Sequence, residues 1–243
     1  MATLASRPPV FAVVRSADRA HADHGWLDTY YSFSFADYVD PANVRWGALR
    51  VFNDDTIAPG SGFPTHPHRD MEIVTYVLSG ELAHRDSLGN HGVVGPGGVQ
   101  FMSAGTGVAH SEVNDSREHP LHLVQMWVLP GQLGGEPSYG QMDFSVDQRR
   151  NRWLEVVSGE PGVDAPVRIT QRATLRVARV EGTSIVAEFA PQRYGFLFVA
   201  DGTVEVNGEA LQAGDSVRVY DVARLAVGGR GEVVLWDTPE VEP

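Results

Sequence analysis

Short apolar segments alternate with turn-forming residues along almost the whole chain, and helical periodicity is weak. The apolar segments are rich in β-branched and aromatic residues. Gly, Pro, Asn and Asp separate them at intervals of about 8–12 residues, which is typical of a sandwich or barrel. We therefore predict an all-β protein, with strands at residues 46–53, 72–79, 80–87, 99–103, 121–129, 183–189, 194–200, 203–206, 216–219 and 232–236.

The order of strands and glycine-containing turns in residues 77–98 recurs in residues 199–215. Two copies of one unit indicate duplicated barrels packed together, although two unrelated β-meanders would share the same order. A Pro- and Gly-rich stretch at 130–139 separates the copies. We predict an N-terminal metal-binding barrel at residues 1–130 and a C-terminal barrel at residues 131–243.

Composition restricts the kind of protein and its partners. The chain has 243 residues, of which 42% are hydrophobic and 21% charged, as in ordinary globular domains. A formal net charge of −12 argues against direct contact with nucleic acid, because a phosphate backbone would be repelled. Residues 1–14 lack a secretory signal, and no apolar stretch reaches the roughly 20 residues that span a bilayer. We expect a cytoplasmic protein without membrane contact.

The residues most suggestive of chemistry are histidines and carboxylates at alternate positions in two segments. All nine histidines lie at or before His122, so the second barrel is expected to bind no transition metal and to cover the first. If both segments are extended, alternate side chains point to one face. A divalent metal would satisfy such a cluster inside a barrel; the alternatives are surface histidines or pairing without metal. The candidates are His66, His68, Asp70 and Glu72 in the first segment, and His110 and Glu112 in the second.

The same segments resemble known motifs. The spacing His66-x-His68-x3-Glu72-x7-Gly80 is similar to the first cupin motif, and Gly107-x2-His110-x3-Asn114 resembles the core of the second. More narrowly, residues 10–130 resemble the bacterial branch of the pirin family. The stretches that carry the resemblance are His24-Gly25-Trp26-Leu27-Asp28, Phe33-Ser34-Phe35-Ala36-Asp37-Tyr38, His66-Pro67-His68-Arg69-Asp70-Met71-Glu72, Met102-Ser103-Ala104-Gly105-Thr106-Gly107 and His110-Ser111-Glu112.

The resemblance implies two cupin barrels and a choice between two carboxylates that the spacing leaves open. Ordinary cupins use the first-motif Glu as a ligand, whereas the pirin pattern implies that Glu112 binds the metal. Glu72 is then left to orient an imidazole from outside the ligand set, to serve a packing role, or to act as the base. The implied metal ligands are His66, His68, His110 and Glu112.

Three imidazoles and a carboxylate suit one divalent transition metal with open positions. The chain has no cysteine, so a closed thiolate zinc site is excluded. We predict Fe(II), with Zn, Mn, Ni, Co and Cu as alternatives. The family includes quercetin 2,3-dioxygenases, which implies a flavonol-like substrate and O2, with Glu112 or Glu72 as the base. The residues expected to line a flat substrate pocket are Trp26, Phe33, Phe35, Phe63, Gln125 and Met126, although each of the apolar ones, taken alone, is more typical of a buried core residue.

Two other functions stay open at this point. One is a non-catalytic, metal-dependent regulator, with redox sensing as its signal, that acts through a protein partner. The other is a scaffold in which the metal only stabilises the fold. We expect a monomer, because two barrels in one chain already supply the pairing that single cupins obtain by dimerising.

Overall fold

The computed structural model describes residues 7–241, and strands make up nearly all of the regular structure. Residues 1–6 and 242–243, the outer ends of the two predicted domains, lie outside the described part. Helical structure in residues 7–241 comprises a 3-10 turn, Ser16–Asp18, and α1 (Val146–Arg149). The strands are β1 (Val10–Val14), β2 (Ala20–Asp23), β3 (Leu27–Tyr31), β4 (Leu49–Ile57), β5 (Gly62–His68), β6 (Glu72–Ser79), β7 (Leu82–Asp86), β8 (His91–Val94), β9 (Val99–Ser103), β10 (Val108–Asn114), β11 (Leu121–Val128), β12 (Ser138–Met142), β13 (Leu154–Ser158), β14 (Val167–Arg168), β15 (Thr174–Glu181), β16 (Ile185–Glu188), β17 (Tyr194–Val206), β18 (Glu209–Gln212), β19 (Ser216–Tyr220) and β20 (Arg224–Thr238).

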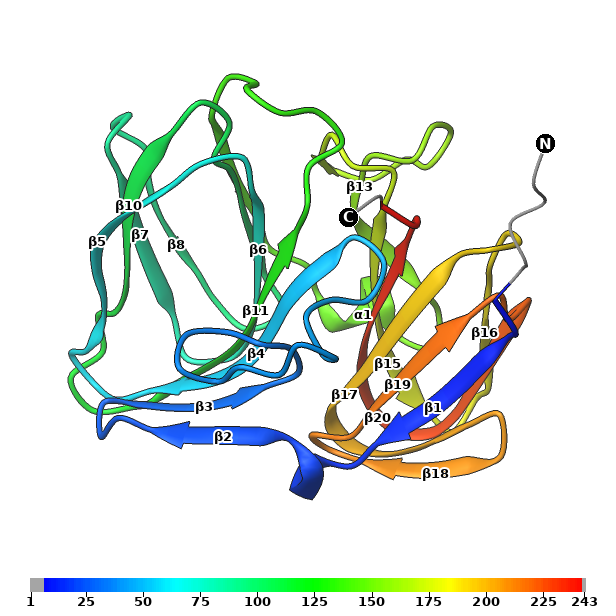
Figure 1. The fold of residues 1–243 in the computed structure, drawn as a ribbon. Coiled ribbons are helices and arrows are strands. Elements are labelled where there is room, and N and C mark those ends of the chain that lie inside the picture. The colour runs from blue at the N-terminus through cyan, green and yellow to red at the C-terminus, as the bar shows by residue number, and fades with distance from the viewer. Residues whose placement is uncertain (1–6, 242–243) are drawn as a thin grey trace.

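The strands form two barrels side by side, which confirms the predicted fold class (Figure 1). In the first barrel, a seven-stranded sheet in the order β12-β9-β6-β11-β4-β3-β2 packs on a four-stranded sheet in the order β5-β10-β7-β8. A nine-stranded sheet forms the second barrel, with β17 and β20 as its longest strands. Both barrels have the antiparallel pairing expected of cupins, apart from the short parallel pair β13 and β14.

Two strands cross the predicted division between the barrels. β1, near the N-terminus, pairs with β19 of the second barrel, and Figure 1 shows it in dark blue at that barrel's edge. β12 lies after residue 130 but pairs with β9 of the first barrel. A boundary at residues 130/131 therefore does not match the strand pairing, because each barrel includes one edge strand that comes from the other side of this boundary.

The list of predicted strands omits observed strands in both barrels, among them β3 and β8 in the first and β15 in the second, and it gives two strands of the second barrel wrong bounds. The segments at 194–200 and 203–206 belong to one strand, β17, which continues through a bulge between Val199 and Asp201. The segment at 232–236 is only the end of β20, whose first half contains Gly228, Gly229 and Gly231. Glycines usually favour turns, so the predicted segment covers only the last part of this strand.

The largest apolar cluster lies between the barrels. Side chains alternate across each strand, so Phe196 and Phe198 of β17 point toward the first barrel, while Leu197 points into the second. On β11, Val124 and Met126 face the second barrel in the same way. The second barrel's own interior is filled mainly by aliphatic residues, with Phe189 among them. No helix in the described residues is long and apolar enough to cross a membrane.

Candidate metal centre

Three imidazoles are brought together by the pairing of β5 with β10. The two strands are antiparallel, with His110 opposite His66 and Val108 opposite His68. β5 is the edge strand of its sheet, where the prolines of the Gly62–His68 segment cost no ladder hydrogen bond. Gly62 allows the close approach, because a Cβ there would lie 2.3 Å from the Glu112 carbonyl oxygen.

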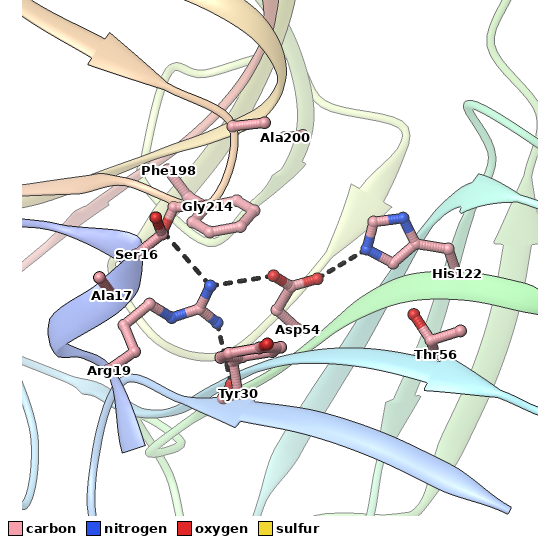
Figure 2. A pocket seen from close by; sticks show the side chains of 11 residues that line it. Ser16, Ala17, Arg19, Tyr30, Asp54, Thr56, His122, Phe198, Ala200 and Gly214 are labelled. Carbon is pink, nitrogen blue, oxygen red and sulfur yellow. Dashed lines mark hydrogen bonds and ion pairs between the residues drawn. The ribbon is translucent and has the colours of Figure 1, made fainter. Parts of the chain in front are cut away.

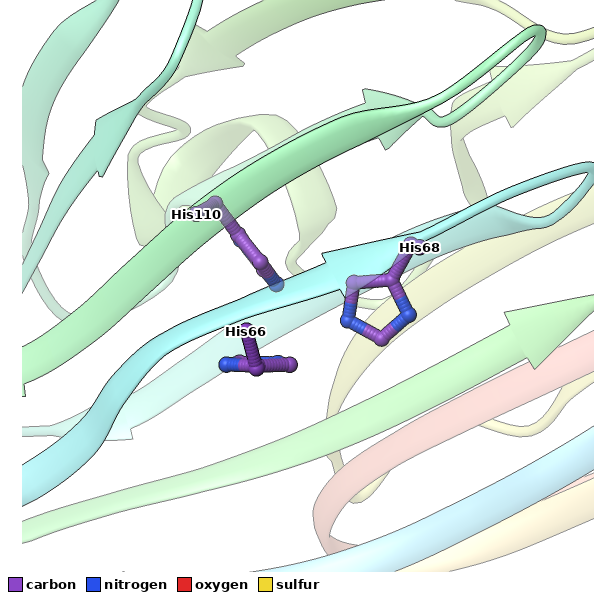
Figure 3. Close-up of side chains that lie close together, drawn as sticks. All are labelled: His66, His68 and His110. Atoms are coloured by element: carbon purple, nitrogen blue, oxygen red, sulfur yellow. The ribbon is translucent and has the colours of Figure 1, made fainter.

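The rings of His66, His68 and His110 converge between the two strands (Figure 3). Their centroids lie 4.6–4.9 Å apart, and one nitrogen of each lies within 4.8 Å of the others. His66 Nδ1 donates to the Pro64 carbonyl at 2.7 Å. Because a carbonyl only accepts, Nδ1 carries the proton and Nε2 of the neutral ring keeps its lone pair. The local backbone thus presents Nε2 of His66 as a ligand atom.

The other two imidazoles have buried nitrogens without partners. His68 Nε2 and His110 Nε2 find no hydrogen-bond partner within the described chain. Burial, with the charges of neighbouring imidazoles, lowers the pKa of His68 to about 4 and that of His110 to about 3. Both rings are therefore neutral at pH 7 and can donate lone pairs. A divalent cation would satisfy these orphaned nitrogens, so the donor set fits a transition metal.

Glu112 lies deeper in the barrel and is held by two amides. Gln100 Nε2 donates to one carboxylate oxygen at 2.7 Å, and Gln125 Nε2 donates to the other at 2.6 Å. Burial raises the pKa of Glu112 to about 7, although the two amides work in the opposite direction. The Glu112 carboxylate forms a cluster with His110 and His84, and it does not lie close to all three of the converging imidazoles. The four predicted ligands therefore form two overlapping clusters that share His110.

Glu72 does not point into the first barrel. Asp70, between His68 and Glu72, has a left-handed φ of 48°, so the chain reverses there instead of staying extended. Glu72 consequently faces the second barrel, where it accepts hydrogen bonds from Thr170 N at 2.6 Å and Thr170 Oγ1 at 2.8 Å. The predictions that Glu72 orients an imidazole or acts as the base are wrong, whereas the alternative of a packing role agrees with its position, because this carboxylate joins the two barrels.

Three of the aromatic residues predicted to line a pocket lie near the imidazoles. One lies next to an imidazole, and the other two pack on rings that do. Phe63 lies next to His66, with ring centroids 6.4 Å apart, and Trp26 packs edge-on against Phe63. Phe35 packs against Trp127, whose ring meets that of His68 at 5.0 Å. These rings form an apolar wall beside the imidazoles.

Phe33 and Met126 are corrections to the predicted pocket. Phe33 is fully buried and packs against Phe196 of the second barrel. The sulfur of Met126 accepts a contact from the Trp236 indole N–H at 3.0 Å. Both side chains belong to the apolar cluster between the barrels: Met126 lies on the sheet face opposite to Gln125, and Phe33 lies in the segment that follows β3. Neither can touch a substrate in the first barrel.

Several residues at the site were not predicted, although some carried a weak signal. Gln100 is a lone polar residue inside an apolar strand, and Trp127 shares a strand face with Gln125 two residues earlier. His84 is buried in β7 and stacks on Tyr139 of β12, with centroids 4.3 Å apart. Alternation along the strands could have identified Gln100 and Trp127. Only the tertiary fold brings Tyr139 to this place.

A separate cavity of about 440 Å³ lies between the two barrels (Figure 2). Its charged groups satisfy one another: Asp54 accepts from Arg19 Nη1 at 2.9 Å and from His122 Nε2 at 2.7 Å. Arg19 is sandwiched between the rings of Tyr30 and Phe198. Burial would raise the pKa of Asp54, but the hydrogen bonds from His122 and Arg19 outweigh it and hold the pKa below its usual value. This cluster connects the barrels.

Fold and site together define a two-barrel cupin protein whose N-terminal barrel carries a histidine-rich cluster suited to a transition metal. Comparison with known families is more specific. The pirin family model matches residues 13–128, and the model described as the quercetinase C-terminal cupin domain matches residues 161–235. The chain belongs to the pirin family.

Similar proteins occur in several bacteria. The quercetin 2,3-dioxygenase of Escherichia coli K12 is 40% identical over 93% of this chain and 98% of its own length. A pirin-like protein of Caulobacter vibrioides is 44% identical over 89% of this chain and 94% of its own. The crystal structure of the E. coli pirin YhhW with nickel(II) superposes with a TM-score of 0.88 and 38% identity, covering 96% of this chain and all of that one.

Proposed function

We propose that this chain is a metal-dependent dioxygenase that opens the ring of quercetin-like flavonols or related enediol compounds with O2. The observation that carries the proposal is the set of three imidazoles converging beside a buried carboxylate. The relatives named quercetin 2,3-dioxygenase support the reaction class. The proposed ligands are His66, His68, His110 and Glu112, with Fe(II) as the resident metal. Bound iron would supply Lewis acidity and open positions for oxygen and substrate.

The residues of the chain have separable tasks in this reaction. Glu112 is proposed to accept the proton of the substrate hydroxyl, because it is the buried carboxylate beside the imidazoles and two amides already orient it. Gln100 and Gln125 fix the direction of its two oxygens. Trp127 and Phe63 give the flat ring of a flavonol apolar surfaces on which to lie and exclude water from the imidazoles.

Turnover by the iron-loaded protein tests the proposal. Protein reconstituted anaerobically with Fe(II) is expected to consume O2 and to bleach the visible absorption of quercetin. His110→Ala is expected to lose both activities, whereas His119→Ala, at an exposed position in the same part of the chain, retains them. If fully metallated wild type leaves a panel of flavonols and catechols unchanged, the dioxygenase proposal fails and a metal-dependent regulator becomes the better interpretation. Uptake of less than half an equivalent of any divalent ion would refute the metal site itself.

We also propose that the protein acts as a monomer in the cytoplasm. The apolar faces of the two barrels cover each other within one chain, so dimerisation is not needed to bury them. Size-exclusion chromatography with light scattering is expected to give the mass of one chain, 26.4 kDa. A stable dimer at micromolar concentration would contradict this expectation.

A further inference from the structure

His84 is a buried histidine that the proposed ligand set does not use. It lies on β7, which pairs with β10, and in this pairing His84 is opposite Glu112 while Asp86 is opposite His110. The His84 side chain has no exposed surface, and its ring stacks on Tyr139 at an interplanar angle of 15°. The imidazole is therefore fixed in direction, and both of its nitrogens must be satisfied inside the protein.

Both nitrogens of His84 face specific partners. His84 Nδ1 lies 3.5 Å from His110 Nδ1, and His84 Nε2 lies 3.4 Å from Asp86 Oδ2. Asp86 is in turn held in place: its Oδ1 accepts from the backbone N–H groups of Leu88 and Asn90, and its Oδ2 accepts from the Asn90 side chain. The two imidazole contacts are long for hydrogen bonds, but the order of atoms is unambiguous: a carboxylate, His84, and then His110.

The order of atoms determines where the protons lie. A neutral imidazole carries one N–H, and two facing Nδ1 atoms share one proton between them. If His110 Nε2 is to bind a metal, the proton of His110 must be on Nδ1, from which it donates to His84 Nδ1. His84 must then carry its own proton on Nε2, which donates to Asp86. No other arrangement of neutral rings satisfies all three positions.

We propose that His84, anchored by Asp86, is a positioning residue that holds His110 in the Nδ1–H form and aims its Nε2 at the metal. The inference rests on the proposed role of His110 as a ligand, and it adds a hydrogen-bonded partner that lies outside the ligand set. Partners of this kind fix the ring orientation of ligating histidines, and removing one typically weakens metal binding by about 10–100-fold.

Zinc(II) serves as a probe of this device because it needs no turnover and leaves NMR spectra interpretable. In zinc-loaded wild type with ¹⁵N-labelled histidine, long-range ¹H–¹⁵N spectra are expected to show the proton of His110 on Nδ1 and that of His84 on Nε2. If His84 has its proton on Nδ1, or if His84 itself binds zinc, the proposal is overturned. This measurement is made on the wild type, so it decides the matter even if a variant does not fold.

Substitutions provide the second readout. His84→Leu removes the acceptor for His110 Nδ1–H, and zinc affinity in a chelator competition is expected to fall about 10–100-fold. His84→Asn places an amide oxygen near the position of Nδ1, so it is expected to recover most of the loss. Tyr139→Phe keeps the ring that stacks on His84 and leaves Asp86, His84 and His110 in place, so it is expected to bind zinc like wild type. Equal affinities for His84→Leu and wild type would contradict a positioning role.

These results are distinguishable from the fate of the proposed dioxygenase activity. Zinc binding with the expected proton positions, combined with failure to convert any flavonol, would support the positioning role of His84 and refute the proposed reaction. Turnover of quercetin by a protein in which His84 carries its proton on Nδ1 would support the reaction and refute the positioning role.

Discussion

Replacing Asp54 by Asn is expected to weaken the contact between the barrels strongly, because it leaves a buried cation without its counter-charge. The Arg19 side chain is only 2% exposed, and Asp54 is the carboxylate that it meets. Orphaning one partner of a buried ion pair costs about 3–5 kcal/mol. Arg19 keeps the Tyr30 carbonyl as an acceptor at 2.9 Å and its two ring contacts, so we expect the lower end, about 3 kcal/mol.

Thermal unfolding of the metal-free protein measures this cost. For a chain of this size, 1 kcal/mol corresponds to about 2–4 °C, so Asp54→Asn is expected to lower the melting temperature by about 6–12 °C. Asp28→Asn is a matched control, because Asp28 also pairs with a histidine, His21, at 2.6 Å but on the exposed surface. An exposed pair contributes less than about 1 kcal/mol, so the control is expected to shift by only a few degrees.

A double variant separates loss of the pair from loss of packing. Arg19→Met together with Asp54→Asn leaves no unpaired charge, and Met can fill the space between the two aromatic rings. The double variant is therefore expected to be more stable than Asp54→Asn alone. Equal melting temperatures for Asp54→Asn and Asp28→Asn, or a double variant no more stable than Asp54→Asn alone, would refute the reasoning.

Three further predictions concern the site, the core and pH. Gly62→Ala is expected to cost about 1–3 kcal/mol and to reduce zinc uptake, because its Cβ would overlap the β10 backbone; Gly95→Ala, where a Cβ meets nothing, is the control in urea unfolding. Phe52→Ala is expected to cost about 3–5 kcal/mol in the same assay, since its ring packs on two rings of the second barrel. Burial opposes the lowered pKa of Asp215, but backbone and arginine hydrogen bonds outweigh it. The stability advantage of wild type over Asp215→Asn is therefore expected to be full above about pH 4 and to disappear as the pH falls further.

The short apolar segments predicted the all-β fold, their repeated order predicted two barrels, and the alternate spacing of the histidines predicted that their rings share a face. The prediction succeeded for His66 and His110 because each lies within a strand, where side chains at alternate positions share a face. It failed for Glu72, because one residue with positive φ, Asp70, reverses the chain and changes the face. The alternation of polar and apolar residues gives no sign that a single Asp adopts a left-handed backbone conformation.

The face of an apolar residue was harder to predict than its burial. Strands of the seven-stranded sheet are covered on both sides, by the four-stranded sheet within the barrel and by the second barrel outside. Met126 and Phe33 were therefore correctly expected to be buried but were assigned to the wrong side. The exchange of β1 and β12 was missed for a related reason, because pairing between distant segments is set by tertiary contacts rather than by local sequence.

The two barrels divide stability and chemistry between them. The interior of the second barrel is mainly aliphatic, and the contact between the barrels is rich in aromatic residues, including Trp236. The first barrel instead buries His84, His110, Gln100 and Glu112, groups whose desolvation opposes folding. The apolar clusters within the first barrel are small, and the largest one that its strands contribute to lies on the sheet face shared with the second barrel, so the first barrel depends in large part on that face. Damage to that contact should therefore loosen the imidazole cluster even though no ligand is touched.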